Sequence, residues 1–321
     1  MFWRKIKHKA KHRTKHKERS NSFFRALFLT GCVFFCSFSV GFSQFGSAVS
    51  KGVLAKSPIN EASGLVASRE NPGFLWTHND SGDESRIFLI DTLAQMRAIY
   101  YLEGVEARDW EEIAWLQADG TNYLIIGDIG DNRAVRPDIT IHIIPEPHFS
   151  AIVDSIAAAI IDTIPATSIQ TYKLHYEDGP RDAEAMFYDP QKEQLYIITK
   201  RELQVGLYGV KIPQESSEIL LLKRKATLPF TFITAADISP NGDEILIKNL
   251  LCVYYWQRKS GESMEHTLSR EATRQPYQPE PQGEAIAFRI DGGGYYTLSE
   301  QLLGLQAHLF FAPHNQPNPI K

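Results

Sequence analysis

The chain has 321 residues, 43% of them hydrophobic, so it is long enough to bury a substantial core. Its formal charge is −4, but residues 1–25 carry ten lysines and arginines against one acid. The remaining residues therefore carry about −13, and such an acidic balance argues against nucleic-acid binding.

The first segment predicts export to the periplasm, the cell surface or the medium. A basic run at 1–25 precedes an uncharged, phenylalanine-rich run at 26–43, the order of a signal peptide cleaved before Gln44. Two alternatives stay open: an uncleaved membrane anchor, because 18 apolar residues approach the length of a span, and a lipoprotein, because residues 29–32 resemble a lipidation box. Cleavage would leave Cys252 as the single cysteine, so no intrachain disulfide is expected.

Residues 44–321 predict one all-β domain built from a repeated hairpin. An apolar strand opens with a small or acidic residue, a turn rich in Gly, Asp, Asn or Pro follows, and a second apolar strand ends in a polar residue. The first strands open at Ser63, Glu112, Glu184, Ala236 and Glu284, and the second strands end at Asp80, Asp128, Lys200, Lys248 and Glu300. A period near 50 residues with four short strands per unit is typical of a β-propeller. Five blades are preferred, and six are the alternative because the second interval is long.

That long interval contains an insertion at 148–168, whose Ala/Ile pattern predicts a short helix or an apolar loop between two outer strands. The fifth unit, in contrast, lacks one outer strand before the chain ends. We expect residues 52–55 to supply it, because a strand from the N-terminal side would close the ring and remove the exposed edge.

The openings of the first strands should converge around the propeller axis. Carboxylates crowded into one channel repel each other unless they are protonated or bound to a cation. The sequence therefore predicts a Ca²⁺ site whose ligands are Ser63, Glu112, Glu184 and Glu284. The alternative is a channel that holds only water and hydrogen-bonded acids.

The ends of the second strands should form another ring at the channel mouth. Here Lys200, Arg201 and Lys248 are expected to bind phosphate or carboxylate, and Asp80 and Asp128 to orient an attacking water. The alternative for the three basic residues is a salt bridge to Asp80 or Asp128.

Several motifs resemble known proteins. The runs SGLVAS, PGFLWTHNDSGD, DWEEIAW and GDIGDNRAVRPDITIHIIPEP, within residues 62–147, resemble a group of exported bacterial propeller proteins whose activities are mostly uncharacterised. The pattern of strand openings is also similar to that of the calcium-activated nucleotidases (apyrases), five-bladed propellers with an axial calcium. That resemblance implies calcium at Ser63, Glu112, Glu184 and Glu284 and nucleotide phosphates near Asp80 and the basic residues, whereas Ala236 departs from the pattern.

The expected function is therefore calcium-dependent hydrolysis of a phosphoester or phosphoanhydride at the channel mouth. The alternative is a non-catalytic propeller that binds a ligand or a protein and whose axial metal, or water-filled channel, is structural. Expected partners are a small anionic ligand or a protein, with no nucleic acid and no membrane contact beyond an uncleaved N-terminal segment. The protein is expected to be a monomer.

Overall fold

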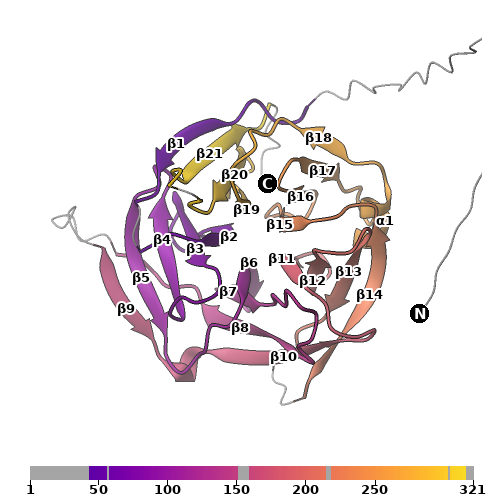
Figure 1. Ribbon diagram of the computed structural model, residues 1–321, viewed down its shortest axis with the longest axis horizontal. Helices are drawn as coiled ribbons and strands as arrows, with labels where there is room; N and C mark the ends of the chain where they lie inside the picture. Colours follow the sequence, from indigo (N-terminus) through magenta and orange to yellow (C-terminus); the bar gives the residue numbers. More distant parts are fainter. Residues whose placement is uncertain (1–42, 56–57, 151–158, 215–217, 303, 316–321) are drawn as a thin grey trace, which may run out of the picture. The chain divides into compact units, whose positions relative to one another are not determined.

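The strands surround a central axis in the computed structural model, which describes residues 43–55, 58–150, 159–214, 218–302 and 304–315 (Figure 1). Residues 41–321 form one compact unit. The expected signal peptide lies outside the described residues except for Ser43. Among the described residues, no helix is long and apolar enough to span a membrane.

Consecutive strands pair antiparallel, in runs that start near the axis and move outward. The first two runs are β2 (Ala62–Ala67), β3 (Phe74–Asn79), β4 (Arg86–Asp91) and β5 (Met96–Leu102), then β6 (Trp110–Ala118), β7 (Thr121–Asp128), β8 (Ile139–Pro145) and β10 (Gln170–Tyr176). The third run is β11 (Ala183–Asp189), β12 (Gln194–Thr199), β13 (Val205–Val210) and β14 (Leu220–Leu228). Because β10 and β14 pair in parallel, the second and third runs join into one eight-stranded sheet.

The strands that follow β14, together with β1, form two further sheets. One contains β15 (Ile233–Ile238), β16 (Glu244–Asn249), β17 (Val253–Gln257) and β18 (Thr273–Gln275), with the short helix α1 (Met264–Ser269) between its last two strands. The other contains β19 (Gly283–Phe288), β20 (Gly294–Ser299), β21 (His308–Pro313) and β1 (Val49–Val53). Since β1 pairs antiparallel with β21, a strand from each end of the described chain completes one sheet, as the sequence predicted, although β1 begins earlier than expected.

The innermost strands contact each other in a closed order: β2 with β6, β6 with β11, β11 with β15, β15 with β19 and β19 with β2. This closed ring defines a β-propeller and confirms the predicted all-β class. The hydrophobic core consists of separate clusters between neighbouring sheets or runs, such as the one that contains Trp76 and Trp110. The first strand of each run is almost wholly buried, which explains its near-continuous apolar sequence.

The predicted hairpin turns lie between the first and second strands of each run. At Asp119 and Gly120 both backbone φ angles are positive, at 50° and 76°, as a two-residue type I′ turn requires. The insertion differs from the prediction. Its described part contains β9 (Ile160–Ile164), which pairs in parallel with β5, and a single 3₁₀ turn, η1 (Ala166–Ser168), rather than a helix. Residues 151–158 of this segment lie outside the described residues.

Candidate metal centre

A β-bulge near the start of every innermost strand decides which side chains enter the channel mouth. The residues that the bulges leave unpaired are Gly64, Glu111, Glu184, Thr234 and Glu284. A bulge inserts one residue and re-aims its side chain. Of the five expected ring residues, Glu184 and Glu284 coincide with bulge positions, whereas Ser63, Glu112 and Ala236 lie one or two positions away from the bulge. The spacing between Ala236 and Lys248 is shorter than the corresponding spacing in the other four hairpins, which indicated that Ala236 was misaligned.

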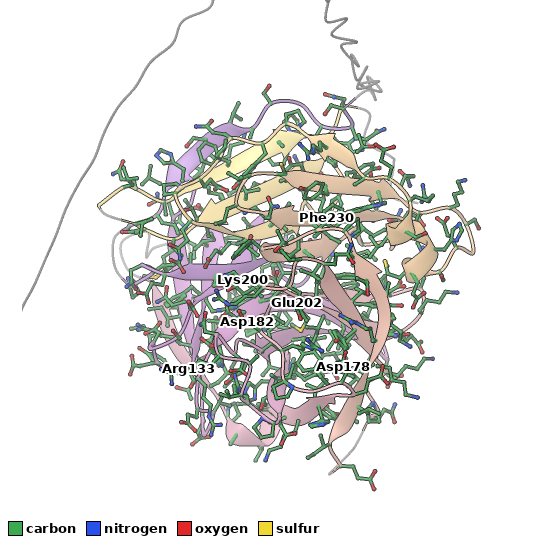
Figure 2. The ribbon with its side chains drawn as sticks, turned by 45° about the vertical axis from the view of Figure 1, so that its right-hand side comes forward. Arg133, Asp178, Asp182, Lys200, Glu202 and Phe230 are labelled. Carbon is green, nitrogen blue, oxygen red and sulfur yellow. The ribbon has the colours of Figure 1, made fainter. Side chains whose placement is uncertain are left out.

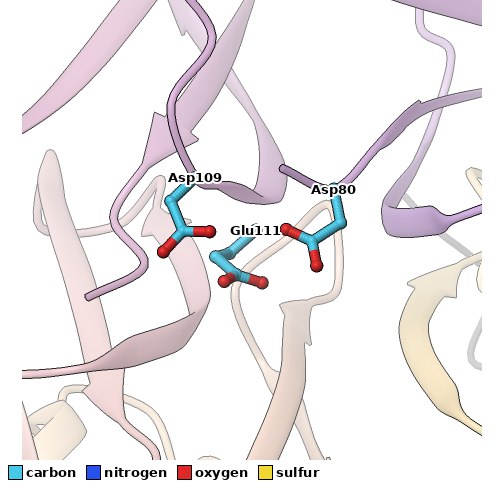
Figure 3. Close-up of side chains that lie close together, drawn as sticks. All are labelled: Asp80, Asp109 and Glu111. Carbon is cyan, nitrogen blue, oxygen red and sulfur yellow. The ribbon is translucent and has the colours of Figure 1, made fainter. Parts of the chain in front are cut away.

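Four carboxylates gather around that of Asp80 at this end of the ring. Asp80, Asp109 and Glu111 form one group, and Asp80, Glu284 and Glu300 form another; within each group the ligand oxygens lie within 4.8 Å of one another. Figure 3 shows the first group, in which the three carboxylates point toward a common space. Asp80 belongs to both groups. The arrangement is a candidate site for a cation that prefers oxygen ligands.

The fold brings these groups together because the start of a first strand lies beside the end of its partner strand. The Asp80 amide donates to the Glu61 carbonyl at 2.9 Å, immediately after β3, and the Glu300 amide donates to the Gln282 carbonyl at 3.0 Å, immediately after β20. Both contacts fix the backbone from which a cluster carboxylate extends. Asp80 and Glu300 therefore occupy corresponding positions in neighbouring sheets.

Gly130 forms one wall of the first group. A Cβ atom at this position would lie 2.4 Å from Oε1 of Glu111 and 2.5 Å from Cγ of Asp109. Any larger residue would have to displace these carboxylates. The second glycine of the GDIGDN motif thus lets the backbone pass directly behind the acidic cluster.

Burial and mutual repulsion perturb the cluster strongly. Burial, a hydrogen bond with the Glu284 carboxyl and repulsion from Glu284 and Asp80 raise the pKa of Glu300 to about 9. Burial and the neighbouring acids Asp109 and Glu284 raise the pKa of Asp80 to about 6. For the same two reasons the pKa of Asp109 is raised, and that of Glu111 lies well above its ordinary value. A bound cation would oppose all of these shifts.

Lys200 and Arg201 lie at the mouth as expected, but each is already paired with an acid. Lys200 forms an ion pair with Glu184, and its Nζ lies 3.9 Å from Oε1 of Glu284. Arg201 forms an ion pair with Asp182 and a hydrogen bond with Asn132. Figure 2 places Lys200 and Asp182 on the same side of the ring. The salt-bridge alternative therefore applies to both basic residues, with Glu184 and Asp182 rather than Asp80 or Asp128 as partners.

Lys248 does not lie at the mouth, which corrects its expected position. Its side chain is fully buried, donates to the Gly283 carbonyl and lies 5.1 Å from the centre of the Tyr277 ring. The nearby Glu280 carboxylate attracts the ammonium group, although burial still lowers the pKa of Lys248. Lys248 is therefore part of the interior of the ring and does not contact a ligand at the mouth.

Glu112 and Ser63 also differ from their expected roles. The Glu112 carboxylate accepts hydrogen bonds from the backbone amides of Ile113 at 3.1 Å and of Leu65 and Ala236 at 3.3 Å. It therefore ties β6 to β2 and to β15, and burial raises its pKa well above the ordinary value. The Ser63 hydroxyl donates to the Glu111 carbonyl at 2.8 Å. Neither side chain belongs to the two carboxylate groups.

The two predicted water-orienting acids are separated in the structure. Asp80 lies at the centre of the cluster, but Asp128 forms an ion pair with Arg136 at 2.7 Å and accepts a hydrogen bond from the Arg108 amide at 3.1 Å. From the sequence, neither Asp109 nor Glu111 was assigned to the site. The signal that could have found them was the run DWEE, whose three acids span the bulge.

Comparisons with known proteins leave the function open. No protein-family model matches the chain, and no curated protein matches it. Among solved structures, the PQQ-bound form of aldose sugar dehydrogenase from Streptomyces coelicolor is similar, with a TM-score of 0.44 and 9% sequence identity. The match covers 83% of this chain and 98% of that one. A similarity at this level transfers no activity or cofactor to the present chain.

Proposed function

We propose that the protein is an exported propeller of five blades that binds Ca²⁺ at the Asp80 cluster and uses it to hydrolyse a phosphate ester or anhydride. The observation that carries this proposal is the pair of carboxylate groups that share Asp80. In this proposal each antiparallel run of four strands is one blade, which gives five blades. The parallel pairing of β10 with β14 is then a contact between two neighbouring blades.

The donor set fits a hard divalent cation. Calcium takes six to eight oxygen ligands at about 2.3–2.6 Å, and carboxylates are its usual protein ligands. Asp80 and Asp109 are half-buried, whereas Glu111, Glu284 and Glu300 are buried. Because two of the ligands are half-buried, part of the coordination shell would remain open to water and to substrate oxygens. A catalytic site requires such open positions, whereas a purely structural site does not.

Electrostatic positioning supplies most of the rate enhancement in phosphoryl transfer, so no side-chain nucleophile is needed. A cation at the cluster would attract the phosphoryl oxygens and lower the pKa of a bound water. Asp80 and Asp109 are exposed enough to accept a hydrogen bond from that water. Arg201, whose side chain is 44% exposed beside the mouth, and Lys200 would contact further phosphoryl oxygens.

The ion pairs of Lys200 and Arg201 favour a second candidate, a propeller that binds its ligand through the cation without catalysis. Each basic group would have to loosen an existing contact, with Glu184 or Asp182, before it could bind phosphate. In that case the cation would be retained and the turnover would be absent.

One assay separates the two candidates. The purified protein is incubated with nucleotides and generic phosphoesters, with calcium or with a chelator, while phosphate release and bound calcium are measured. We expect calcium-dependent release that Asp80→Asn abolishes, with Asp119→Asn at an exposed hairpin turn as the matched control. Bound calcium without release would establish the non-catalytic candidate, and neither binding nor release would refute both.

A further inference from the structure

We infer that the cluster holds two divalent cations bridged by the Asp80 carboxylate, one against Asp109 and Glu111 and the other against Glu284 and Glu300. The inference rests on the cation binding in the proposed function and deepens it, since the cluster would be a binuclear centre rather than a single calcium site. Its starting point is the position of Asp80 between two groups of acids that come from different sheets.

The separation of the ligand oxygens argues against one shared cation. Two oxygens bound to the same calcium are at most about 5 Å apart, because each bond is about 2.3–2.6 Å long. Within each group all the ligand oxygens meet this condition, at 4.8 Å or less, but the five side chains do not form one such group. A single ion would therefore leave one pair of acids without coordination.

Each group also contains a buried carboxylate that no basic residue neutralises by direct contact. Glu111 is 2% exposed, and within the described ranges its carboxylate has no hydrogen bond or ion pair. Glu300 is 7% exposed and shares a hydrogen bond with Glu284, another acid. An uncompensated buried carboxylate is costly unless it is paired, protonated or bound to a metal. Glu111 thus points to a ligand on one side of Asp80. On the other side, a cation would take the place of the proton that Glu284 and Glu300 share.

The charge balance supports two ions. The five acids carry five negative charges when ionised, while Lys200 is mainly engaged by Glu184. One divalent cation would leave three of these charges, whereas two would leave one. Pairs of bridged divalent ions are also well suited to phosphoryl groups, because each ion can contact a different oxygen of the reacting group.

Stoichiometry tests the inference directly. Calcium bound per full-length chain is measured by calorimetry and by elemental analysis after gel filtration, and we expect two ions for the parent and for the control Asp119→Asn. The pair Asp109→Asn with Glu111→Gln, and separately the pair Glu284→Gln with Glu300→Gln, should each retain one ion. Asp80→Asn should weaken both sites by at least about tenfold, since a bridging ligand contacts both ions.

A second readout does not depend on calcium or on turnover. In the parent protein loaded with Mn²⁺, electron paramagnetic resonance should show magnetic coupling between two ions, and either paired variant should show one isolated ion. Circular dichroism and thermal unfolding verify that every variant is folded. One ion per parent chain, or loss of all binding in a folded paired variant, would overturn the binuclear centre. Two bound ions without phosphate release would instead contradict only the catalytic part of the proposed function.

Discussion

Glu111 and Glu112 are adjacent in the chain but have different environments. The Glu111 carboxylate lies in the acidic cluster, whereas the Glu112 carboxylate accepts hydrogen bonds from three backbone amides. Successive side chains of a strand point to opposite faces, and the bulge at Glu111 shifts that alternation. An error of one residue in the register therefore exchanges a candidate metal ligand for a structural acceptor.

We predict that Glu112→Gln destabilises the protein by about 1–3 kcal/mol. The NH2 group of the glutamine side chain would replace a carboxylate oxygen that accepts a hydrogen bond from a backbone N–H, and would leave that N–H without an acceptor. Calcium stoichiometry should not change, since Glu112 lies outside both carboxylate groups. Urea unfolding and calcium titration of the same samples test both parts. Lost calcium binding at unchanged stability would make Glu112 a metal ligand, as the sequence first suggested.

At the scale of elements, the segment that leads into β1 closes the ring by side-chain packing as well as by strand pairing. Phe45, 1% exposed, has its ring centre 4.8 Å from those of Tyr295 and His314 and 5.6 Å from that of Tyr255. These contacts join the sheet of β19–β21 to the sheet of β15–β18. The closing segment thus links two neighbouring sheets.

Phe45→Ala should therefore cost about 3–5 kcal/mol, the usual effect of removing a large buried aromatic side chain. Val49, within β1, is 51% exposed, so Val49→Ala is the matched control and should change stability by less than about 1 kcal/mol. Thermal and denaturant unfolding measure both. Equal losses in the two variants would show that strand pairing, rather than the Phe45 contacts, closes the ring.

The elements were largely predictable because their signals are local. Alternating or continuous apolar residues identified most strands, and Gly, Asp, Asn and Pro identified the hairpin turns. The helix α1 was missed, although Ser263 caps it by accepting a hydrogen bond from the His266 amide. β9 was missed because its three central residues are exposed and its pairing partner, β5, lies far away in the sequence.

At the scale of the whole molecule, the acidic cluster couples stability to pH. Glu300 and Asp80 have pKa values of about 9 and about 6 in the folded protein, above their ordinary values near 4. The folded state therefore holds protons more tightly than the unfolded state. This contribution to stability is fully present below about pH 4 and is lost as the pH rises through about 6 and then about 9.

In a chelator, we therefore expect the melting temperature to fall as the pH rises across this window. Excess calcium should oppose the fall, because the cation compensates the newly ionised carboxylates and binds only the folded site. Glu300→Gln should flatten the upper part of the profile in the chelator. The measurement is thermal unfolding against pH, with and without calcium. Identical profiles in both conditions would mean that the cluster binds no calcium.

The sequence by itself determined most of the strands, the turns, the all-β class and the closing role of the N-terminal strand, because these depend on patterns within a few residues and on their repetition. Only the tertiary structure decided which acids meet. The bulges add a residue that no hydrophobic period reveals, and closure of the ring brings Asp80, Asp109, Glu111, Glu284 and Glu300 together from three sheets. The position of Lys248 was likewise decided by the tertiary structure. Its ammonium group donates a hydrogen bond to the Gly283 carbonyl and is attracted by the Glu280 carboxylate, and neither residue is near Lys248 in the sequence.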